Sequence, residues 1–389
     1  MIRDKTAIVG VGRTTQYKRG ESFPQTRMEL GAKAILAALA DAGLTVRDVD
    51  GFSQYCVHQG LEVHLLAPMI GVPNVTFSAG VTGGGNGVTG AIMLAADAIA
   101  SGSANVVVCF KALQQAEGRR IGQLGKGAAG AAAPAVGSEM DFMKPFGKLA
   151  PGQIFAGWAT RHMHLYGTQR KHYAQVAVQQ RANANRCPAA VMHDIPMTVD
   201  DYFKARMVND PFCLFDFCLE TDGAAAVVVV SADRAASLRR KPVYIMAGAQ
   251  GGGISPIMPD EVVGWSGQKG NAKSLFKMAG VGPKDMDVAE LYEAFSPQVL
   301  WQLEDFGFCP EGQSGPFVGE GHTAWPNGDI PVNTHGGNLS DAYLMGLTHV
   351  IEAVEQLRGT AINQVKDAEL ALVAGGPASL PQSALILRR

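Results

Sequence analysis

The sequence has few charged residues and no long hydrophobic run. Asp, Glu, Lys and Arg make up 17% of the 389 residues, and the formal net charge is −2. Without an excess of basic residues, nucleic acid is not expected as the main partner. No run of about 18 apolar residues occurs, so we expect no membrane span. The opening segment, MIRDKTAIVGVG, contains no apolar stretch of signal-peptide length, and we expect a cytoplasmic protein.

Common metal-binding and nucleotide-binding patterns are also missing. The six cysteines, at positions 56, 109, 187, 213, 218 and 309, show no paired spacing of the zinc-binding kind. We therefore expect no metal site and reduced thiols. No GxGxxG motif with a suitably spaced acidic residue follows a predicted strand, and there is no Walker motif. These absences argue against a dinucleotide or ATP site.

Glycine, in contrast, is abundant, and a glycine turn occurs twice. The chain has 47 glycines, and Gly84-Gly85-Asn86 recurs as Gly336-Gly337-Asn338. Each copy precedes a predicted helix and then a small apolar strand. These elements are Ala91–Ser101 and Asn105–Phe110 after the first copy, and Leu344–Leu357 and Glu369–Ala374 after the second.

The repetition extends upstream of both turns. The sequence AGLTVRDVD (42–50) parallels AGVGPKDMD (279–287), and each follows a predicted strand and helix. Because similar elements occur in the same order twice, we predict an internally duplicated α/β protein. Its N-terminal half would comprise residues 1–118 and 206–238, and its C-terminal half residues 239–389.

Residues 119–205 interrupt this pattern and form a predicted insertion. The segment is basic in a chain that is slightly acidic, with Arg119, Arg120, Lys126 and Lys144 ahead of its helical part. One interpretation is that such charges are solvated helix faces. The other is that they hold an anionic ligand, such as a nucleotide 3′-phosphate and pyrophosphate.

The stretch PVNTHGGNLSDAYLMGLTHV (331–350) is the first candidate for a functional site. Its glycine pair, Gly336 and Gly337, lies where a predicted strand gives way to a helix. Backbone N–H groups at such a turn suit an oxygen that is, or becomes, negatively charged. His335 and Tyr343 are the polar groups beside the turn. The alternative is a glycine-rich connector with an incidental histidine and tyrosine.

A second candidate is AELYEAF (289–295), in which Glu290, Tyr292 and Glu293 lie at the end of a predicted strand. The carboxyl ends of strands in α/β sheets are where ligand sites form. In a duplicated fold this strand end should face the glycine turns. We therefore predict that Tyr292 and Tyr343 share one pocket.

Taken together, ETDGAAAVVVVS (220–231), AELYEAF, VNTHGGNLSDAYLMG (332–346) and the late AGG (374–376) resemble the thiolase superfamily. The chain is most similar to its sterol-carrier-protein-x thiolase-like branch, over essentially its whole length. This resemblance implies a thiolase fold, with two βαβαβαββ-type halves in five αβαβα layers and an inserted loop domain.

Departures from the thiolase pattern concern the catalytic residues. The position of the family's nucleophilic cysteine falls at about Gly85, and no cysteine lies between Cys56 and Cys109. The family's Gly-His-Pro step corresponds to Ala342-Tyr343-Leu344, and the first residue of its NEAF-like motif corresponds to Tyr292. We therefore expect no thiol in the pocket of Tyr343, and no acyl-enzyme.

The remaining pattern resembles thiolase-like aldolases that cleave steroid side-chain 3-hydroxyacyl-CoA esters by retro-aldol reaction. That chemistry needs an acid, a base and oxyanion donors. The resemblance suggests Tyr292 and Tyr343 as acid and base, and His335 or the turns at Gly85, Gly336 and Gly337 as donors. A tyrosine base requires a lowered pKa or a coupled proton relay. The alternative role for both tyrosines is structural.

The resemblance also implies partners. CoA would enter as part of the substrate, with no other cofactor. A small protein with an OB-fold and a zinc ribbon would join a homodimer of this chain in a heterotetramer. We expect the dimer to form through the apolar strand at 105–110, as an exposed edge. Two other functions remain open: an acyl-CoA acyltransferase with a different nucleophile, and a non-catalytic acyl-CoA or sterol-binding subunit.

Overall fold

The computed structural model describes residues 3–57, 59–82, 87–117, 143–148, 150–251, 264–376 and 382–389. Among these residues, the strands form a 10-stranded sheet and a small separate hairpin. The main path of the large sheet is β10-β11-β12-β9-β1-β8-β5-β3-β4, and β2 pairs with β8. The strands of this sheet are β1 (Thr6–Arg13), β2 (Tyr17–Lys18), β3 (Gly51–Tyr55), β4 (Phe77–Val81), β5 (Val106–Gln114), β8 (Thr221–Ser231), β9 (Val243–Gly251), β10 (Val288–Leu291), β11 (Leu370–Ala374) and β12 (Gln382–Arg388).

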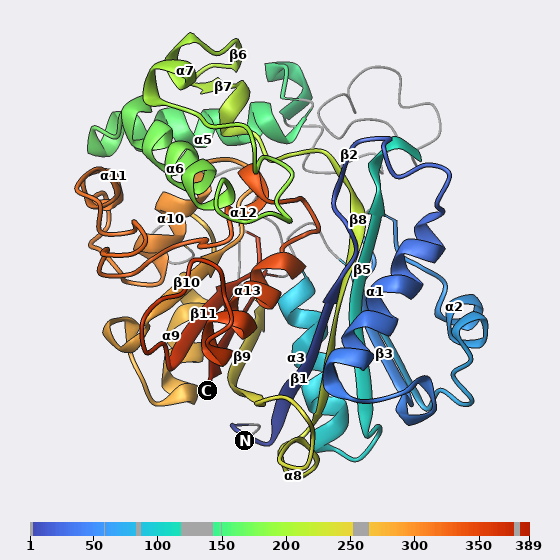
Figure 1. Ribbon diagram of the computed structural model, residues 1–389. Helices are drawn as coiled ribbons and strands as arrows, with labels where there is room; N and C mark the ends of the chain where they lie inside the picture. Colours follow the sequence, from blue (N-terminus) through green and yellow to red (C-terminus); the bar gives the residue numbers. More distant parts are fainter. Residues whose placement is uncertain are drawn as a thin grey trace.

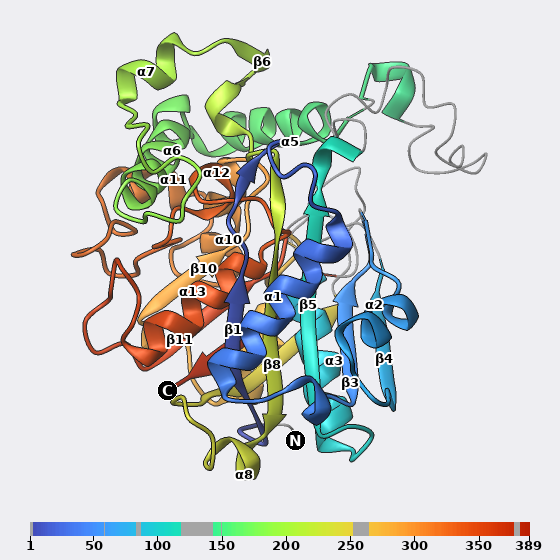
Figure 2. The same cartoon turned by 45° about the vertical axis from the view of Figure 1, so that its right-hand side comes forward.

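The large sheet consists of a C-terminal part, β9 to β12, and an N-terminal part that contains the other strands. The two parts meet at a short pairing of β1 with β9. In the described residues β1 meets β9 at two residue pairs, Ala7 with Tyr244 and Ile8 with Val243. Helices α3 (Val88–Ala100) and α13 (Leu347–Arg358) contact strands of both parts and therefore lie between them. Helix α1 (Arg27–Ala42) packs outside the N-terminal part, and α9 (Lys269–Ala279) outside the C-terminal part. This order of layers, visible in Figures 1 and 2, confirms the predicted fold class.

The duplicated AGxxxxDxD motif has the same structural role in both halves. Gly43 and Gly280 end α1 and α9 with φ values of 73° and 72°, a left-handed conformation that glycine adopts without a Cβ clash. A 3₁₀ turn follows each one, η1 (Val46–Asp48) and η6 (Pro283–Asp285).

The last aspartate of each motif then anchors the neighbouring strand. The Asp50 carboxylate accepts hydrogen bonds from the backbone N–H groups at positions 105 and 106, at the start of β5. The Asp287 carboxylate accepts them from positions 369 and 370, at the start of β11. Equivalent residues thus make equivalent contacts, which confirms that the two halves are structural repeats.

Between β5 and β8, which are neighbours in the sheet, the chain forms a helical insertion. It covers one end of the C-terminal half (Figure 1), where its central helix α6 packs against α11 and α12. The predicted boundary at residues 118 and 119 lies outside the described residues. The elements of the insertion and the helices that it covers are η2 (Gln115–Glu117), η4 (Lys144–Phe146), α5 (Pro151–Tyr166), α6 (Arg170–Ala184), α7 (Val199–Lys204), β6 (Met207–Asn209), β7 (Phe212–Cys213), η5 (Leu214–Asp216), α10 (Pro297–Asp305), α11 (Ser314–Gly319) and α12 (Gly337–Ser340).

Two expectations about the elements are wrong. The strand predicted at 105–110 is β5, which is paired with β8 on one side and with β3 on the other. Its apolar sequence reflects burial on both faces, so it is not an edge through which a dimer could form. The described edge on that side is β4, with alternating partly exposed residues. The helix predicted to follow Tyr343 directly begins three residues later than predicted, at Leu347.

Two smaller helices complete the description, α2 (Val63–Ile70) against α1 and α8 (Ala232–Ala235) against β1 and β8. No helix within the described ranges is long and apolar enough to cross a membrane.

Candidate active site

The two tyrosines named from the sequence meet in the central layer. Tyr292 directly follows β10, and Tyr343 lies in the irregular segment between α12 and α13. Their hydroxyl oxygens are 2.9 Å apart, within hydrogen-bond distance. Both side chains are buried, with exposures of 7% and 5%. The prediction that they share one pocket is confirmed, and their catalytic role remains a prediction.

Burial decides the protonation state of the pair. Burial raises the pKa of both Tyr292 and Tyr343. The nearby Tyr343 phenol raises the pKa of Tyr292 further. Neither phenol is therefore ionised near neutral pH. Of the two requirements for a tyrosine base, a lowered pKa is not met. A coupled relay, in which one phenol gives up its proton as it accepts another, is compatible with this geometry.

Backbone contacts fix both tyrosines. The Tyr292 N–H donates to the carbonyl of Ala374 in β11 at 3.1 Å, and its carbonyl accepts from Gln302 Nε2 at 2.7 Å. The Tyr343 N–H donates to Thr221 Oγ1 at 2.9 Å, and that hydroxyl donates to the Tyr343 carbonyl at 3.2 Å. Since Thr221 begins β8, one tyrosine is held by each half of the protein.

The glycine turn is occupied by a carboxylate of the protein itself. Gly336 and Gly337 have φ values of 112° and 61°, as a tight turn into α12 requires. Beyond the turn, Glu293 Oε1 accepts hydrogen bonds from the N–H groups of Asn338 at 2.7 Å and Leu339 at 3.3 Å. The Gly336 N–H donates to the carbonyl of Asn333. These three N–H groups are engaged within the protein, and the oxyanion role expected for the second turn stays a prediction.

A buried histidine links this carboxylate to the tyrosines. His349 Nε2 lies 3.0 Å from Glu293 Oε2, and the His349 ring is 6.4 Å from the Tyr292 ring. Burial alone would lower the pKa of His349, but the Glu293 carboxylate raises it overall. Glu293 therefore connects α12 with the first turn of α13 and holds the segment that carries Tyr343.

His335 lies one ring further from the tyrosines. Its ring packs edge-on against His349 at 4.7 Å, and its Nδ1 is 3.1 Å from Glu290 Oε2. Burial lowers the pKa of His335 to about 4 and raises that of Glu290 to about 7. A neutral imidazole behind His349 is in a position to support the network. The described contacts do not bring it to the tyrosine hydroxyls.

Comparisons with known proteins agree with this architecture. Residues 258–389 match the family model described as thiolase C-terminal domain-like. The chain is 36% identical to the 17-hydroxy-3-oxo-4-pregnene-20-carboxyl-CoA lyase of Mycobacterium tuberculosis, over 100% of both chains. It is also 36% identical to the steroid side-chain-cleaving aldolase of Thermomonospora curvata, over 98% of this chain and 97% of the relative. The solved Ltp2-ChsH2(DUF35) aldolase superposes with a TM-score of 0.90 at 36% identity, covering 100% of this chain and 98% of that one.

The chain belongs to the thiolase-fold aldolases. Membership rests on 36% identity over nearly the full length of both chains. The site is therefore interpreted as that of an acyl-CoA lyase and not of an acyl-transferring thiolase. In this aldolase, two phenols meet at the position for which the sequence predicted acid and base.

One expectation about sulfur in this aldolase is wrong. Cys218, which lies just ahead of β8, packs against the cluster that contains both tyrosines, and its charge would raise the pKa of each. A thiol therefore does lie near the pair. Burial raises the pKa of Cys218 itself, and Glu293 adds to that effect. The thiol form is inert, whereas an acyl-transferring cysteine must be a thiolate.

Several predicted residues lie outside the described part of the aldolase. These are Gly85, in the first glycine turn, and Arg119, Arg120 and Lys126, in the predicted anion cradle. Lys144 begins η4, but its side chain is not among those described. Among the described residues, no three His, Cys, Asp or Glu side chains are arranged to hold a metal ion.

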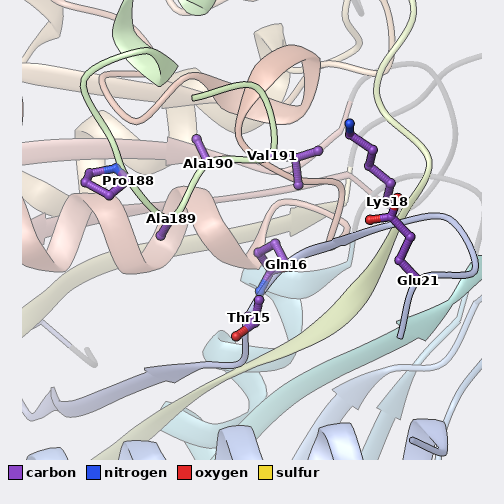
Figure 3. A pocket seen from close by; sticks show the side chains of 8 residues that line it. All are labelled: Thr15, Gln16, Lys18, Glu21, Pro188, Ala189, Ala190 and Val191. Carbon is purple, nitrogen blue, oxygen red and sulfur yellow. The ribbon is translucent and has the colours of Figure 1, made fainter. Parts of the chain in front are cut away.

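A pocket with a volume of about 360 Å³ opens at the junction of the N-terminal part and the insertion (Figure 3). None of the predicted site residues lines it. Its walls are residues 15, 16, 18 and 21 near β2, and the loop 188–191. This loop is hydrogen-bonded to the segment between α12 and α13 that contains Tyr343, because the Val191 N–H donates to the carbonyl of Asp341 at 2.9 Å.

Sequence reasoning did not identify two residues of the site, His349 and Met345. The Met345 sulfur lies 3.2 Å from the Tyr343 hydroxyl. Its backbone is left-handed, with φ of 56°, which the sequence does not indicate at a methionine. His349 lies within the predicted helix, and it does not stand out there because the same helix also contains Glu352, Glu355 and Gln356.

Proposed function

We propose that the chain is an aldolase that cleaves the Cα–Cβ bond of a bulky 3-hydroxyacyl-CoA, giving a ketone and a short acyl-CoA. The observation that carries this proposal is the 2.9 Å contact between the two buried, neutral phenols. Full-length similarity to lyases named for steroid acyl-CoA substrates supports a steroid side chain as the acyl group. In the compound that names one relative, the hydroxyl is on C17 and the carboxyl-CoA group on C20, a β-hydroxy thioester.

In this mechanism the phenol pair acts as a closed proton relay. One tyrosine accepts the proton of the substrate hydroxyl while its own proton passes to the other tyrosine. The Cα–Cβ bond breaks, its electrons form the thioester enolate, and the hydroxyl carbon becomes a ketone. As it receives that proton, the second tyrosine passes its own proton to Cα, so both phenols are neutral at the end of the step. Such a relay needs no nucleophile and no tyrosinate of long lifetime.

A partner protein completes the proposal. The similar solved structure is a complex named for ChsH2(DUF35), which supports a partner for this chain as well. We assign that role to a small OB-fold and zinc-ribbon protein that binds a homodimer of this chain. The dimer would form by pairing of β4 with its copy, since β4 is the described strand edge of the N-terminal half. Light scattering of the mixed proteins should give the mass of a heterotetramer, and masses of monomers alone would contradict this assembly.

The function is tested by product analysis. Incubation of the partnered enzyme with 17-hydroxy-3-oxo-4-pregnene-20-carboxyl-CoA should release a 17-ketone and a short acyl-CoA in equal amounts, with no added thiol acceptor. Binding of the ester without turnover would instead indicate a binding subunit.

The nearby Cys218 keeps acyl transfer as a second candidate. An acyltransferase would form an acyl-cysteine adduct that mass spectrometry detects, and iodoacetamide would abolish its activity. The lyase should show neither effect at Cys218, because the raised pKa keeps this partly buried thiol protonated.

A further inference from the structure

We propose that Met345 is a positioning residue that sets the direction of proton transfer through the tyrosine pair. This inference rests on the proposed function and adds a direction to it. Among the described residues, the Tyr343 hydroxyl is within hydrogen-bond distance of the Tyr292 hydroxyl, at 2.9 Å, and of Met345 Sδ, at 3.2 Å. All three side chains are buried, so water does not compete freely for these contacts.

The chemistry of the three atoms fixes who donates. A thioether sulfur has no proton and can only accept, and it is a weak acceptor. Tyr343 has one proton, so when that proton points at Met345 Sδ, the contact between the phenols must be made by the proton of Tyr292. The Tyr292 oxygen then has lone pairs free to receive the substrate hydroxyl. This arrangement makes Tyr292 the base and Tyr343 the acid.

The backbone conformation that places the Met345 sulfur beside the Tyr343 hydroxyl is an unfavourable one. Met345 has φ of 56°, in the left-handed region that residues with a Cβ rarely occupy, and Gly346 follows with φ of 81°. This reversal turns the Met345 side chain back onto Tyr343, two residues earlier. Unfavourable backbone conformations that persist in a packed interior cluster at functional sites.

During the reaction the Tyr343 proton leaves its hydrogen bond to the Met345 sulfur and moves to carbon. The substrate hydroxyl proton moves to Tyr292, the Tyr292 proton moves to Tyr343, and the proton that pointed at Met345 moves to Cα of the enolate. The electron pair of the broken carbon–carbon bond becomes the enolate and then the new C–H bond. A weak acceptor suits this position, because it orients the proton and gives it up easily.

The test replaces the sulfur and keeps the volume. Met345→Leu preserves an apolar side chain of similar size and leaves the same backbone conformation. We expect kcat of the partnered enzyme to fall about three- to tenfold, the loss of one weak hydrogen bond, with KM little changed. The matched control is Met286→Leu, because Met286 is equally buried but packs in the other core, around α9 and α10. This control should leave kcat unchanged.

A second background separates orientation from packing. In Tyr343→Phe there is no hydroxyl proton to orient, so adding Met345→Leu should cause no further loss of kcat in single-turnover experiments. An equal loss in both backgrounds would show that Met345 only packs, and wild-type kcat in Met345→Leu would also overturn the inference. Near-normal turnover of Tyr343→Phe would instead overturn the proposed function, so the two failures are distinguishable.

Discussion

Tyr55 and Tyr292 occupy equivalent positions in the two halves of the molecule. Each follows an aspartate that anchors a neighbouring strand, Asp50 or Asp287, and each lies five residues beyond it in sequence. Both are buried, and the charge of Tyr55 would raise the pKa of Tyr292 and Tyr343, so the two repeats direct a phenol toward the same region. Their partners differ, however. Tyr292 meets a second phenol, whereas Tyr55 lies beneath Lys111 Nζ, 5.5 Å from its ring centre.

The same contrast holds two residues earlier in each half. Ser53 in β3 corresponds to Glu290 in β10. Only the C-terminal strand thus contributes a carboxylate, and this carboxylate supports the histidines behind the tyrosine pair. Duplication therefore explains why the two halves have the same elements. Different residues at equivalent positions, such as Ser53 and Glu290, explain why the proposed catalytic groups lie in the C-terminal half.

The largest expected effect on kcat comes from removing the Tyr343 hydroxyl, which pairs with that of Tyr292. Tyr343→Phe should lower kcat at least about 10²-fold with a modest change in KM, because an acid or base acts mainly in the transition state. Steady-state kinetics of the partnered enzyme measures this loss. A folded variant with near-normal turnover would remove Tyr343 from the mechanism.

A second prediction concerns the carboxylate that β3 lacks. Burial raises the pKa of Glu290 from 4.5 to about 7, so the folded state holds a proton that the unfolded state releases. The contribution of Glu290 to the free energy of unfolding is present below about pH 4.5 and is lost as pH rises to about 7, by roughly 1.4 kcal/mol per pKa unit. Glu290→Gln should therefore flatten the decline of Tm across this range.

Calorimetry at several pH values between 4.5 and 7 would measure that slope. Glu369→Gln is a suitable control, because the Glu369 side chain is 70% exposed. An unchanged slope in Glu290→Gln would show that Glu290 is ionised in the folded protein.

Tyr55→Phe tests the N-terminal member of the comparison. The hydroxyl that lies 2.9 Å from that of Tyr343 belongs to Tyr292, so for Tyr55→Phe we expect kcat to fall less than about tenfold, well short of the general acid–base range. A loss as large as that of Tyr343→Phe would mean that both repeats supply proton-transfer groups.

The smallest expected effect is that of Cys218→Ser. The thiol lies near the pair but is protonated, so kcat should stay within about twofold of wild type. Complete loss of turnover, in a variant with unchanged Tm, would favour the acyltransferase.

Local repetition in the sequence predicted much of this structure. The AGxxxxDxD copies predicted the duplication, and the structure adds that the last aspartate of each copy anchors a strand distant in sequence. The pairing of Tyr292 with Tyr343 followed from placing both at junctions of a duplicated fold. What sequence reasoning could not supply are long-range relations: β5 lies inside the sheet, Glu293 fills the glycine turn, and Cys218 packs near the tyrosines.

The central claim is that the two phenols work as a single unit, and the double variant tests it most directly. We would measure kcat for Tyr292→Phe, Tyr343→Phe and the combined variant, each in the partnered enzyme. A relay loses its function when either hydroxyl is removed, so the double variant should be little slower than the slower single variant. Multiplication of the two individual losses would contradict the account, because it would mean that the tyrosines act independently.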